Sequence, residues 1–263
     1  MSTPFLNNET MLCYEDICLM MEQKSFWVEY EPLIDMSSGD IFGYEALARF
    51  VLRGENIPPS PVLEVAHQVN ELFFKLEKML KQEQLKHRPK EGILFLNIDP
   101  HNFSDSEKIA YWRELFTDKE DICIEVTENT DGMQTLLLSH CLDEIQNSGI
   151  PIAQDDIGND QKPFCFDVTR RASFLKFDRS WLYKIRACTD YQEILKGFLA
   201  FAKAQNKKCV LEGIECDEDF AIAKALGVDF IQGYLFKHLN HKSPNKIRMN
   251  VPSPYQNHKL TGV

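Results

Sequence analysis

The feature that most constrains the fold of this chain is an alternation of short apolar runs with longer amphipathic stretches. The runs read, in chain order, GILFLNID, DICIEVTE, PIAQDD, FLKFDRS, KKCVLEGI and FIQGYLF. The stretches around 106–116, 133–147, 190–205 and 217–226 show helical spacing of their apolar residues. Buried strands that alternate with helices are typical of parallel βα units, so the sequence predicts an α/β fold.

The opening of the chain has a different pattern. The segments SFWVEYEPLID and DIFGYEALARF, joined at Ser37-Ser38-Gly39, predict a β-hairpin. A single helix is expected to open at Ser60-Pro61 and to continue, by its apolar spacing, to Leu80. Asp190 with Glu193 fits a capping box at the start of a later helix.

These elements together favour a TIM-like (β/α)8 barrel in which one of the first two strands runs antiparallel to the rest. A doubly wound open sheet is the alternative, but no GxGxxG or P-loop follows the early strands. The length of 263 residues allows one large domain or two small ones. We expect an N-terminal arm over 1–24, the barrel domain over 25–240 and a polar C-terminal tail over 241–263.

Charge and cysteine usage exclude several classes of protein. The net charge of −11 argues against a binder of nucleic-acid polymers or of anionic membranes, which needs a basic face. No apolar run approaches the length of a transmembrane helix, and the acidic start of the chain is unlike a signal peptide. The eight cysteines are scattered without CxxC pairs, which favours reduced, mostly buried thiols. We therefore expect a cytoplasmic protein without a membrane span.

Polar residues stand at or near the end of each apolar run. In chain order they are Glu45, Asn97, Glu125, Asp155-Asp156, Lys176, Glu212 and Gln232. In a barrel these positions converge on the C-terminal face, where active sites of this fold are built. So many carboxylates would repel one another unless cations were bound. Ligation by oxygen, without a histidine cluster, favours Mg²⁺ or Mn²⁺ over zinc.

Three of these observations allow closer readings. Asp155 and Asp156 would point to opposite faces of a regular strand, so a shared site requires a bend, which Gly158 is placed to permit. One of the two aspartates could then bridge two metal ions, as in phosphodiester hydrolysis. Lys176 either orients the attacking water or forms a structural ion pair with Asp178 or Asp156. Glu45 and Arg49 share strand parity, so one could reach a metal and the other a phosphate.

The segments YEALARF, FLNID, CIEVTEN, QDDIG, LKFDRSW, VLEGIE and IQGYLF, in this order, resemble the EAL domain. The resemblance covers roughly residues 25–240, and no second signalling domain is recognised, so we expect a stand-alone EAL protein. Known members are metal-dependent phosphodiesterases that hydrolyse cyclic di-GMP to linear pGpG in bacteria. The resemblance implies a TIM-like barrel with one antiparallel strand, in agreement with the hairpin.

The resemblance also implies roles for single residues. A first metal ion would be held by Glu45, Asn97, Glu125 and Asp155. Asp155 would bridge to a second ion, which Asp156 and Glu212 also serve. Lys176 would position the attacking water, and Glu212 is the candidate base.

Further residues are assigned to the substrate by the same resemblance. The residues expected to contact cyclic di-GMP or to complete its pocket are Arg49, Asp178, Gln232, Glu215 and Glu31. Glu128 matches the family glutamate that anchors the loop after the aspartate pair. A homodimer is compatible with the resemblance.

The chain departs from the family pattern in places. The loop usually reads DDFGTG followed by small residues, but here it continues Ile157-Gly158-Asn159-Asp160-Gln161-Lys162-Pro163. Glu31 replaces the amide of the opening YQP motif and adds negative charge near an anionic ligand. These departures leave three hypotheses. The chain hydrolyses cyclic di-GMP, or it is an impaired EAL domain acting as a receptor or a protein-binding regulator, or it hydrolyses another dinucleotide.

Overall fold

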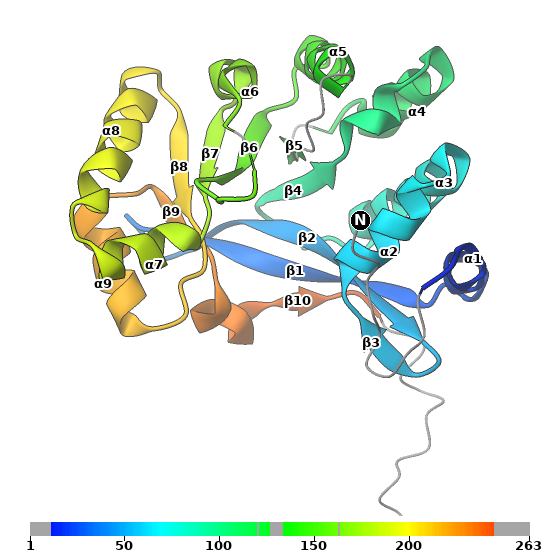
Figure 1. Ribbon diagram of the computed structural model, residues 1–263, viewed down its shortest axis with the longest axis horizontal. Helices are drawn as coiled ribbons and strands as arrows, with labels where there is room; N and C mark the ends of the chain where they lie inside the picture. The colour runs from blue at the N-terminus through cyan, green and yellow to red at the C-terminus, as the bar shows by residue number, and fades with distance from the viewer. Residues whose placement is uncertain (1–11, 120, 127–133, 163, 245–263) are drawn as a thin grey trace, which may run out of the picture. The chain divides into compact units, whose positions relative to one another are not determined.

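The computed structural model of the chain describes residues 12–119, 121–126, 134–162 and 164–244 (Figure 1). Most of its strands form one closed barrel. The barrel strands are β1 (Phe26–Asp35), β2 (Ile41–Leu52), β4 (Ile93–Ile98), β5 (Ile122–Val126), β6 (Ile152–Ile157), β7 (Phe174–Phe177), β8 (Lys208–Leu211) and β9 (Phe230–Ile231). Two short strands, β3 (Glu55–Ile57) and β10 (His241–Lys242), stand at the ends of the strand order.

The pairing of the strands closes the barrel. Neighbours from β2 and β4 through to β9 run parallel. Strand β1 runs antiparallel to β9 and also pairs with β2, which joins the two ends of the sheet. The prediction of a TIM-like barrel with one antiparallel strand at the start is confirmed, and the alternative of a doubly wound open sheet is wrong.

The hairpin between β1 and β2 is closed by local hydrogen bonds. Asp35 Oδ1 accepts from the backbone N–H groups of Ser37, at 2.7 Å, and Ser38, at 3.3 Å. Gly39 takes φ +81°, a conformation that a glycine adopts without strain. The predicted hairpin is therefore confirmed at its predicted turn.

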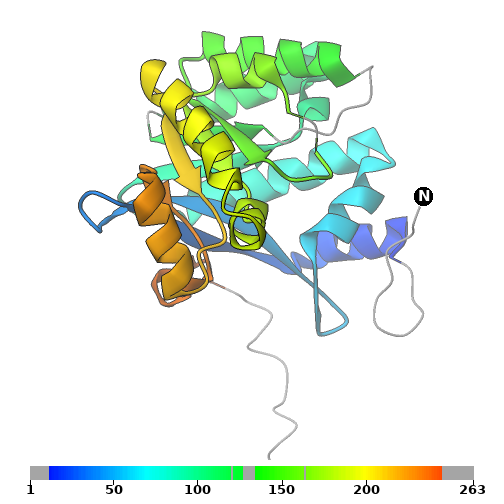
Figure 2. The same ribbon diagram turned by 60° about the vertical axis from the view of Figure 1, so that its left-hand side comes forward.

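Helices follow the parallel strands and lie on the outer side of them (Figures 1 and 2). They are α4 (Ser106–Phe116), α5 (Gln134–Asn147), α6 (Phe166–Arg171), α7 (Ser180–Ala187), α8 (Tyr191–Ala204) and α9 (Asp217–Leu226), with 3-10 segments at η1 (Pro100–Phe103) and η2 (Tyr234–Leu239). The four predicted helices correspond to α4, α5, α8 and α9. The predicted capping box is wrong, because Asp190 itself has helical φ and ψ and makes no side-chain cap.

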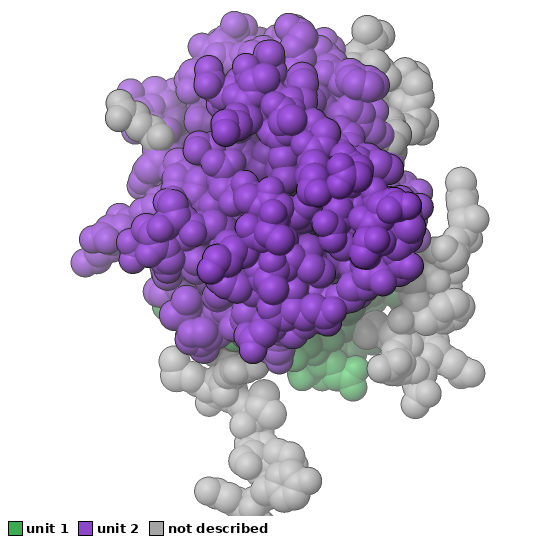
Figure 3. All heavy atoms as spheres, turned by 90° about the vertical axis from the view of Figure 1, so that its left-hand side faces the viewer, with its two compact units in different colours: residues 1–28, 48–83, 242–263 green, residues 29–47, 84–241 purple. Residues whose placement is uncertain are grey.

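By its contacts the chain divides into two compact units, coloured separately in Figure 3. Unit 1 contains residues 1–28, 48–83 and 242–263, and unit 2 contains 29–47 and 84–241. The barrel portions of β1 and β2 and all of β4–β9 belong to unit 2. The expected division into an arm, a barrel domain and a tail stays a prediction.

Unit 1 has its own apolar core, to which α1 (Tyr14–Gln23) and α2 (Pro59–His67) contribute. The expectation of one helix from Ser60 to Leu80 is wrong, since α2 ends and α3 (Asn70–Lys86) begins anew. The N–H groups of Gln68 and Val69 bond to carbonyls three residues back, at 3.2 and 3.1 Å, which tightens and ends α2. Val69, which the spacing placed on the buried face, is 42% exposed.

Among the described residues, no helix is both long and apolar enough to cross a membrane. All eight cysteines are free thiols, and Cys123, Cys141 and Cys209 are buried. Cys123 and Cys209 lie inside β5 and β8, as their apolar surroundings predicted.

Candidate functional site

Inside the barrel an apolar layer is followed along each strand by a polar one. The apolar cluster consists of Leu33, Phe95, Cys123, Ala153, Phe174, Val210 and Phe230. On six of these strands the residue two positions further along is polar. Because side chains on a strand alternate between faces, a residue two positions on lies on the same inward face.

The polar residues reached in this way are Asn97, Glu125, Asp155, Lys176, Glu212 and Gln232. All six were predicted to converge from the strand ends. Glu45 joins them from β2, where it is paired with Phe95 of β4. The structure thus brings the predicted cluster together within unit 2.

Lys176 lies at the centre of this cluster and is 0% exposed. Its Nζ lies within ion-pair distance of four carboxylates: 2.7 Å from Glu125 Oε1, 2.7 Å from Glu212 Oε1, 3.1 Å from Asp155 Oδ1 and 3.3 Å from Glu45 Oε2. The predicted structural alternative, an ion pair with Asp178 or Asp156, is not among these contacts. Lys176 is instead the shared counter-charge of these four carboxylates.

Two amides fix the orientation of Glu45. Asn97 Nδ2 donates to Glu45 Oε1 at 2.9 Å, and Gln232 Nε2 donates to Glu45 Oε2 at 2.7 Å. With Lys176 also on Oε2, both oxygens of Glu45 are bonded. The carboxylate is therefore held rigidly, with its orientation decided by three different strands.

Asp155, Asp156 and Glu212 form a group in which one carboxylate oxygen from each residue lies within 4.8 Å of the other two, a spacing suited to a metal ion. The predicted bend is present. Asp156 itself takes φ +56°, and the register between β6 and β7 shifts between Gln154 and Ile157. A left-handed residue inside a strand turns its side chain toward the face of its neighbour. The bend therefore occurs at Asp156, ahead of Gly158.

One contact of this group was not predicted. Lys162, from the loop after β6, forms an ion pair with Asp156 Oδ2. The exposed fraction of the side chains increases from 0% at Glu125 and Lys176 to 19% at Glu212 and 23% at Asp156. The cluster is accordingly closed on the side of Glu125 and open on the side of Asp156.

Buried oxygens without donors indicate that the cluster suits cations. Glu125 Oε2 and Gln232 Oε1 are buried and receive no hydrogen bond from the described residues. Among the described residues, the five carboxylates of Glu45, Glu125, Asp155, Asp156 and Glu212 pair with only two ammonium groups, those of Lys162 and Lys176. Leaving buried acceptors and negative charges uncompensated is costly. Oxygen ligands with excess negative charge fit hard divalent cations.

The pKa values of these groups reflect the same imbalance. Burial, followed by the charge of Glu45, raises the pKa of Glu125 well above its ordinary range. Burial likewise raises the pKa values of Glu212 and Asp155 despite the nearby lysine. Burial would also raise that of Glu45, but Lys176, Gln232 and Asn97 outweigh it and lower the pKa. Burial would lower the pKa of Lys176, yet the surrounding carboxylates raise it well above its usual value.

These shifts have one chemical meaning. Burial and mutual repulsion disfavour the charged forms of Glu125 and Glu212, as their raised pKa values indicate, while the surrounding carboxylates favour the charged form of Lys176. Carboxyl groups of this kind release their protons when a divalent ion binds. The cluster can therefore hold hard cations and exchange protons at the same place.

Three other residues predicted to contact the substrate, Asp178, Glu215 and Arg49, form bonds with residues outside the cluster. Asp178 Oδ1 accepts from the Ser180 backbone N–H at 2.9 Å at the start of α7. Glu215 is exposed, with Oε1 3.7 Å from Arg179 Nη1. Arg49 belongs to unit 1, where its Nη1 donates to the Ala48 carbonyl at 3.1 Å.

Glu31 lies two residues before Leu33 on β1. Because β1 runs antiparallel, this position corresponds to the polar layer of the other strands. Glu128, the predicted loop anchor, lies outside the described residues. The roles of all these residues stay predictions.

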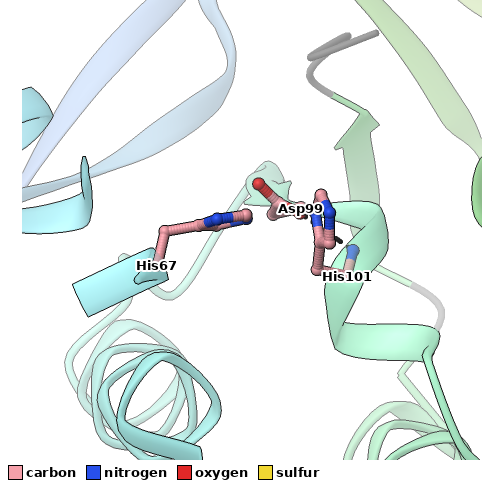
Figure 4. A group of neighbouring side chains, drawn as sticks. All are labelled: His67, Asp99 and His101. Atoms are coloured by element: carbon pink, nitrogen blue, oxygen red, sulfur yellow. Dashed lines mark hydrogen bonds and ion pairs between the residues drawn. The ribbon is translucent and has the colours of Figure 1, made fainter. Parts of the chain in front are cut away.

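A histidine near the end of β4 pairs with an acid. His101 Nδ1 lies 2.7 Å from Asp99 Oδ1 (Figure 4), and Asp99 also accepts from the His101 backbone N–H at 2.8 Å. His67, drawn in the same view, belongs to unit 1. The contact orients the imidazole of His101 within unit 2.

Comparisons of the sequence with family models and with known proteins agree on one family. The family model described as the EAL domain matches residues 15–238. A probable cyclic di-GMP phosphodiesterase, PdeN of Escherichia coli K12, is 26% identical over 247 residues, which cover 85% of this chain and 47% of PdeN. PdeN and two other curated relatives are longer proteins, and this chain spans about half of their length or less.

Solved structures agree in fold. An EAL-domain protein from Listeria monocytogenes EGD-e has a TM-score of 0.69 at 20% identity, covering 87% of this chain and 94% of that one. The Bacillus subtilis YkuI protein, described with its substrate c-di-GMP and calcium, has a TM-score of 0.68 at 20% identity, covering 84% of this chain and 56% of that one. At this identity the likeness establishes the fold.

Proposed function

The chain belongs to the EAL-domain family, and from this premise we propose that it hydrolyses cyclic di-GMP to linear pGpG with two divalent cations, Mg²⁺ or Mn²⁺. The observation that carries the proposal is the gathering of four of the expected ligands, Glu45, Glu125, Asp155 and Glu212, about Lys176. A purely structural role would not require four carboxylates around one buried lysine. Relatives named as cyclic di-GMP phosphodiesterases, at about a quarter identity, support the substrate.

The residues divide into two ligand groups. Glu45, Asn97, Glu125 and Asp155 would hold the first cation, and Asp155, Asp156 and Glu212 the second. When bound, the cations lower the pKa of water and stabilise negative charge on the phosphate oxygens. The donorless Glu125 Oε2 and the acidic group within 4.8 Å support this assignment.

Side chains of the protein would then accept the proton of the attacking water and hold the ligand carboxylates in place. Lys176 keeps the carboxylates oriented and supplies a fixed positive charge beside the attacking water. Glu212, partly exposed, would take the proton of that water at a carboxylate oxygen. Glu45 is held by Asn97 and Gln232 and contributes as a rigid ligand.

Recognition of the dinucleotide would involve groups around the cluster. Arg49 and Asp178 would contact the substrate, and Glu215 and Gln232 would complete its pocket. Glu31 would accept from guanine N–H groups. Glu128 would anchor the loop after β6. The eight free thiols support a cytoplasmic location. We propose that two copies of the chain form a homodimer.

The test is hydrolysis by matched acidic variants. Purified protein is incubated with cyclic di-GMP and Mn²⁺, and the products are resolved by chromatography. Glu45→Ala should lose activity at least about a hundredfold, as expected for a residue that holds a catalytic ion. Glu193→Ala, which removes an exposed carboxylate on α8, is the control and should retain the full rate. A fully active Glu45→Ala protein would refute the metal assignment.

A second function is favoured by the Lys162–Asp156 ion pair and by Glu31. The Lys162 ammonium would oppose a second cation at Asp156, and Glu31 would add negative charge near the phosphates while still accepting from guanine, so the chain would bind cyclic di-GMP without turnover. Calorimetry would then detect tight nucleotide binding while prolonged incubation with Mn²⁺ yields no product. Product formation rejects this alternative. A substrate panel separates both from hydrolysis of another dinucleotide.

A further inference from the structure

Lys162 stands at an unusual place for a surface lysine. Its ammonium pairs with Asp156 Oδ2, and Asp156 belongs to the group with Asp155 and Glu212. Only 30% of the Lys162 side chain is exposed. A positive charge supplied by the chain thus lies beside carboxylates that the proposed function assigns to a divalent ion.

The loop that carries Lys162 is fixed from α7. Trp181 Nε1 donates to the Ile157 carbonyl at 2.8 Å, and Ser180 Oγ donates to the Gly158 carbonyl at 2.9 Å. Lys184 Nζ donates to the same Gly158 carbonyl at 2.6 Å and lies 2.8 Å from Asp160 Oδ1. Three side chains of one helix therefore hold the start of the loop.

The rest of the loop is tied back to Asp156 itself. The N–H of Asn159 donates to the Asp156 carbonyl at 3.1 Å, and the N–H of Lys162 donates to the Asn159 carbonyl at 3.1 Å. These two successive turns bring the backbone of Lys162 back toward the aspartate. The ion pair consequently depends on an anchored backbone as well as on a flexible side chain.

An ammonium and a divalent ion cannot both occupy the same oxygens of Asp156. Removing the ammonium of Lys162 would free the Asp156 carboxylate for a metal ion, whose oxygen ligands lie at about 2.0–2.6 Å. Glu125 Oε2, buried and without a donor, shows that other oxygens of the cluster also lack a partner. The cluster carries more negative than positive charge, and Lys162 compensates part of this excess at Asp156.

We propose that Lys162 is a tethered cation that competes with one divalent metal ion for Asp156, and so weakens metal binding at the open side of the cluster. This inference rests on the proposed function, since it takes the cluster to be a metal site. It assigns a purpose to the loop that departs from the family pattern. The protein would require a higher metal concentration to fill its second position than to fill its first.

The test is Mn²⁺ binding to the full chain by calorimetry, without nucleotide. Lys162→Gln should bind Mn²⁺ at one position at least about tenfold more tightly than wild type, because an opposite charge at this range shifts the proton affinity of a carboxylate by about one to three pKa units. Lys196→Gln is the matched control, since it removes a lysine that is paired with the exposed Glu193 on α8. Its titration should match wild type.

Combining Lys162→Gln with Asp156→Asn tests whether the gain in Mn²⁺ affinity acts through the Asp156 carboxylate. In the Asp156→Asn background, Lys162→Gln should change Mn²⁺ affinity by less than about twofold. Equal affinity of wild type and Lys162→Gln, weaker binding by Lys162→Gln, or an effect that persists without the Asp156 carboxylate would each overturn the inference.

The binding test is independent of catalysis. If Lys162→Gln gains affinity while neither protein hydrolyses cyclic di-GMP, the inference stands and the proposed function fails. If wild type hydrolyses the nucleotide and Lys162→Gln binds Mn²⁺ no better, the proposed function stands and the inference fails.

Discussion

Lys176 Nζ lies 2.7 Å from Glu125 Oε1, and neither side chain is exposed to solvent. The pair forms the closed end of the cluster. Three further carboxylates, those of Glu45, Asp155 and Glu212, lie within ion-pair distance of the same ammonium. A buried charge is tolerated when its partners are in place, and removing one partner is costly. The arrangement therefore makes the cluster important for stability as well as for chemistry.

Replacing Lys176 should destabilise the metal-free protein. Lys176→Met keeps most of the volume but leaves four carboxylates without their common counter-charge. We expect a loss of about 3–5 kcal/mol in the free energy of unfolding, measured by urea denaturation in chelator. Lys196→Met, on the exposed face of α8, should change it by less than about 0.5 kcal/mol. Equal midpoints for Lys176→Met and wild type would contradict the account of the cluster.

Divalent cations should stabilise the fold through the cluster. Any ligand that binds only the native state adds RT ln(1 + [L]/Kd), about 2.7 kcal/mol at a hundredfold excess over Kd. Mn²⁺ should thus raise the melting temperature measured by calorimetry. The increase should shrink in Asp155→Asn, which removes the proposed bridging carboxylate, and persist in Glu193→Gln. An undiminished increase in Asp155→Asn would place the metal elsewhere.

Gly158 is the position in the loop where a side chain is least tolerated. Its φ is +90°, and an added Cβ would lie 2.1 Å from Trp181 Nε1. Gly158→Ala should lower the free energy of unfolding by about 1–3 kcal/mol. Gly197→Ala is the matched control. Gly197 is inside α8 with nothing within 4 Å of an added Cβ, so alanine should stabilise by about 0.5–1 kcal/mol. Urea denaturation compares the two, and a harmless Gly158→Ala would show that the loop is not held by Trp181.

The thiols should fall into a reactive and an unreactive set. Burial raises the pKa of Cys209 to about 12 and those of Cys123 and Cys141 well above the ordinary value. The thiolate is the reactive form, so these three should resist a disulfide reagent at pH 8 until the protein is unfolded. The exposed cysteines, Cys13, Cys188 and Cys216, should react in the native state. Rapid native labelling of Cys123 or Cys141 would contradict the burial of β5 or α5.

Much of the barrel and of the cluster follows from local sequence. The polar residues that end the apolar runs meet because parallel strands present their carboxyl ends on one face. The spacing of these polar residues from the apolar residues before them is a stronger signal in the sequence than their place at the strand ends. Asn97, Glu125 and Asp155 each stand two residues beyond a member of the apolar layer, so strand periodicity alone places them inside the barrel.

Other features depend on backbone conformation or on distant contacts, which periodicity does not encode. The apolar spacing continued through Gln68 and Val69, yet the backbone tightens there and α2 ends. The ion pair of Lys162 with Asp156 requires both the left-handed backbone of Asp156 and the hold of α7 on the loop. Neither condition is visible in the order of residues from 155 to 162.

The most direct test of the central claim is the conversion of cyclic di-GMP by the wild-type protein with Mg²⁺, with Mn²⁺ and with chelator, followed by chromatography. The account predicts that pGpG accumulates with either metal ion and that chelator abolishes it, since among the described residues the five carboxylates of the cluster pair only with Lys162 and Lys176. Unchanged nucleotide after long incubation with both metal ions would contradict the account, and so would product that forms at the same rate in chelator.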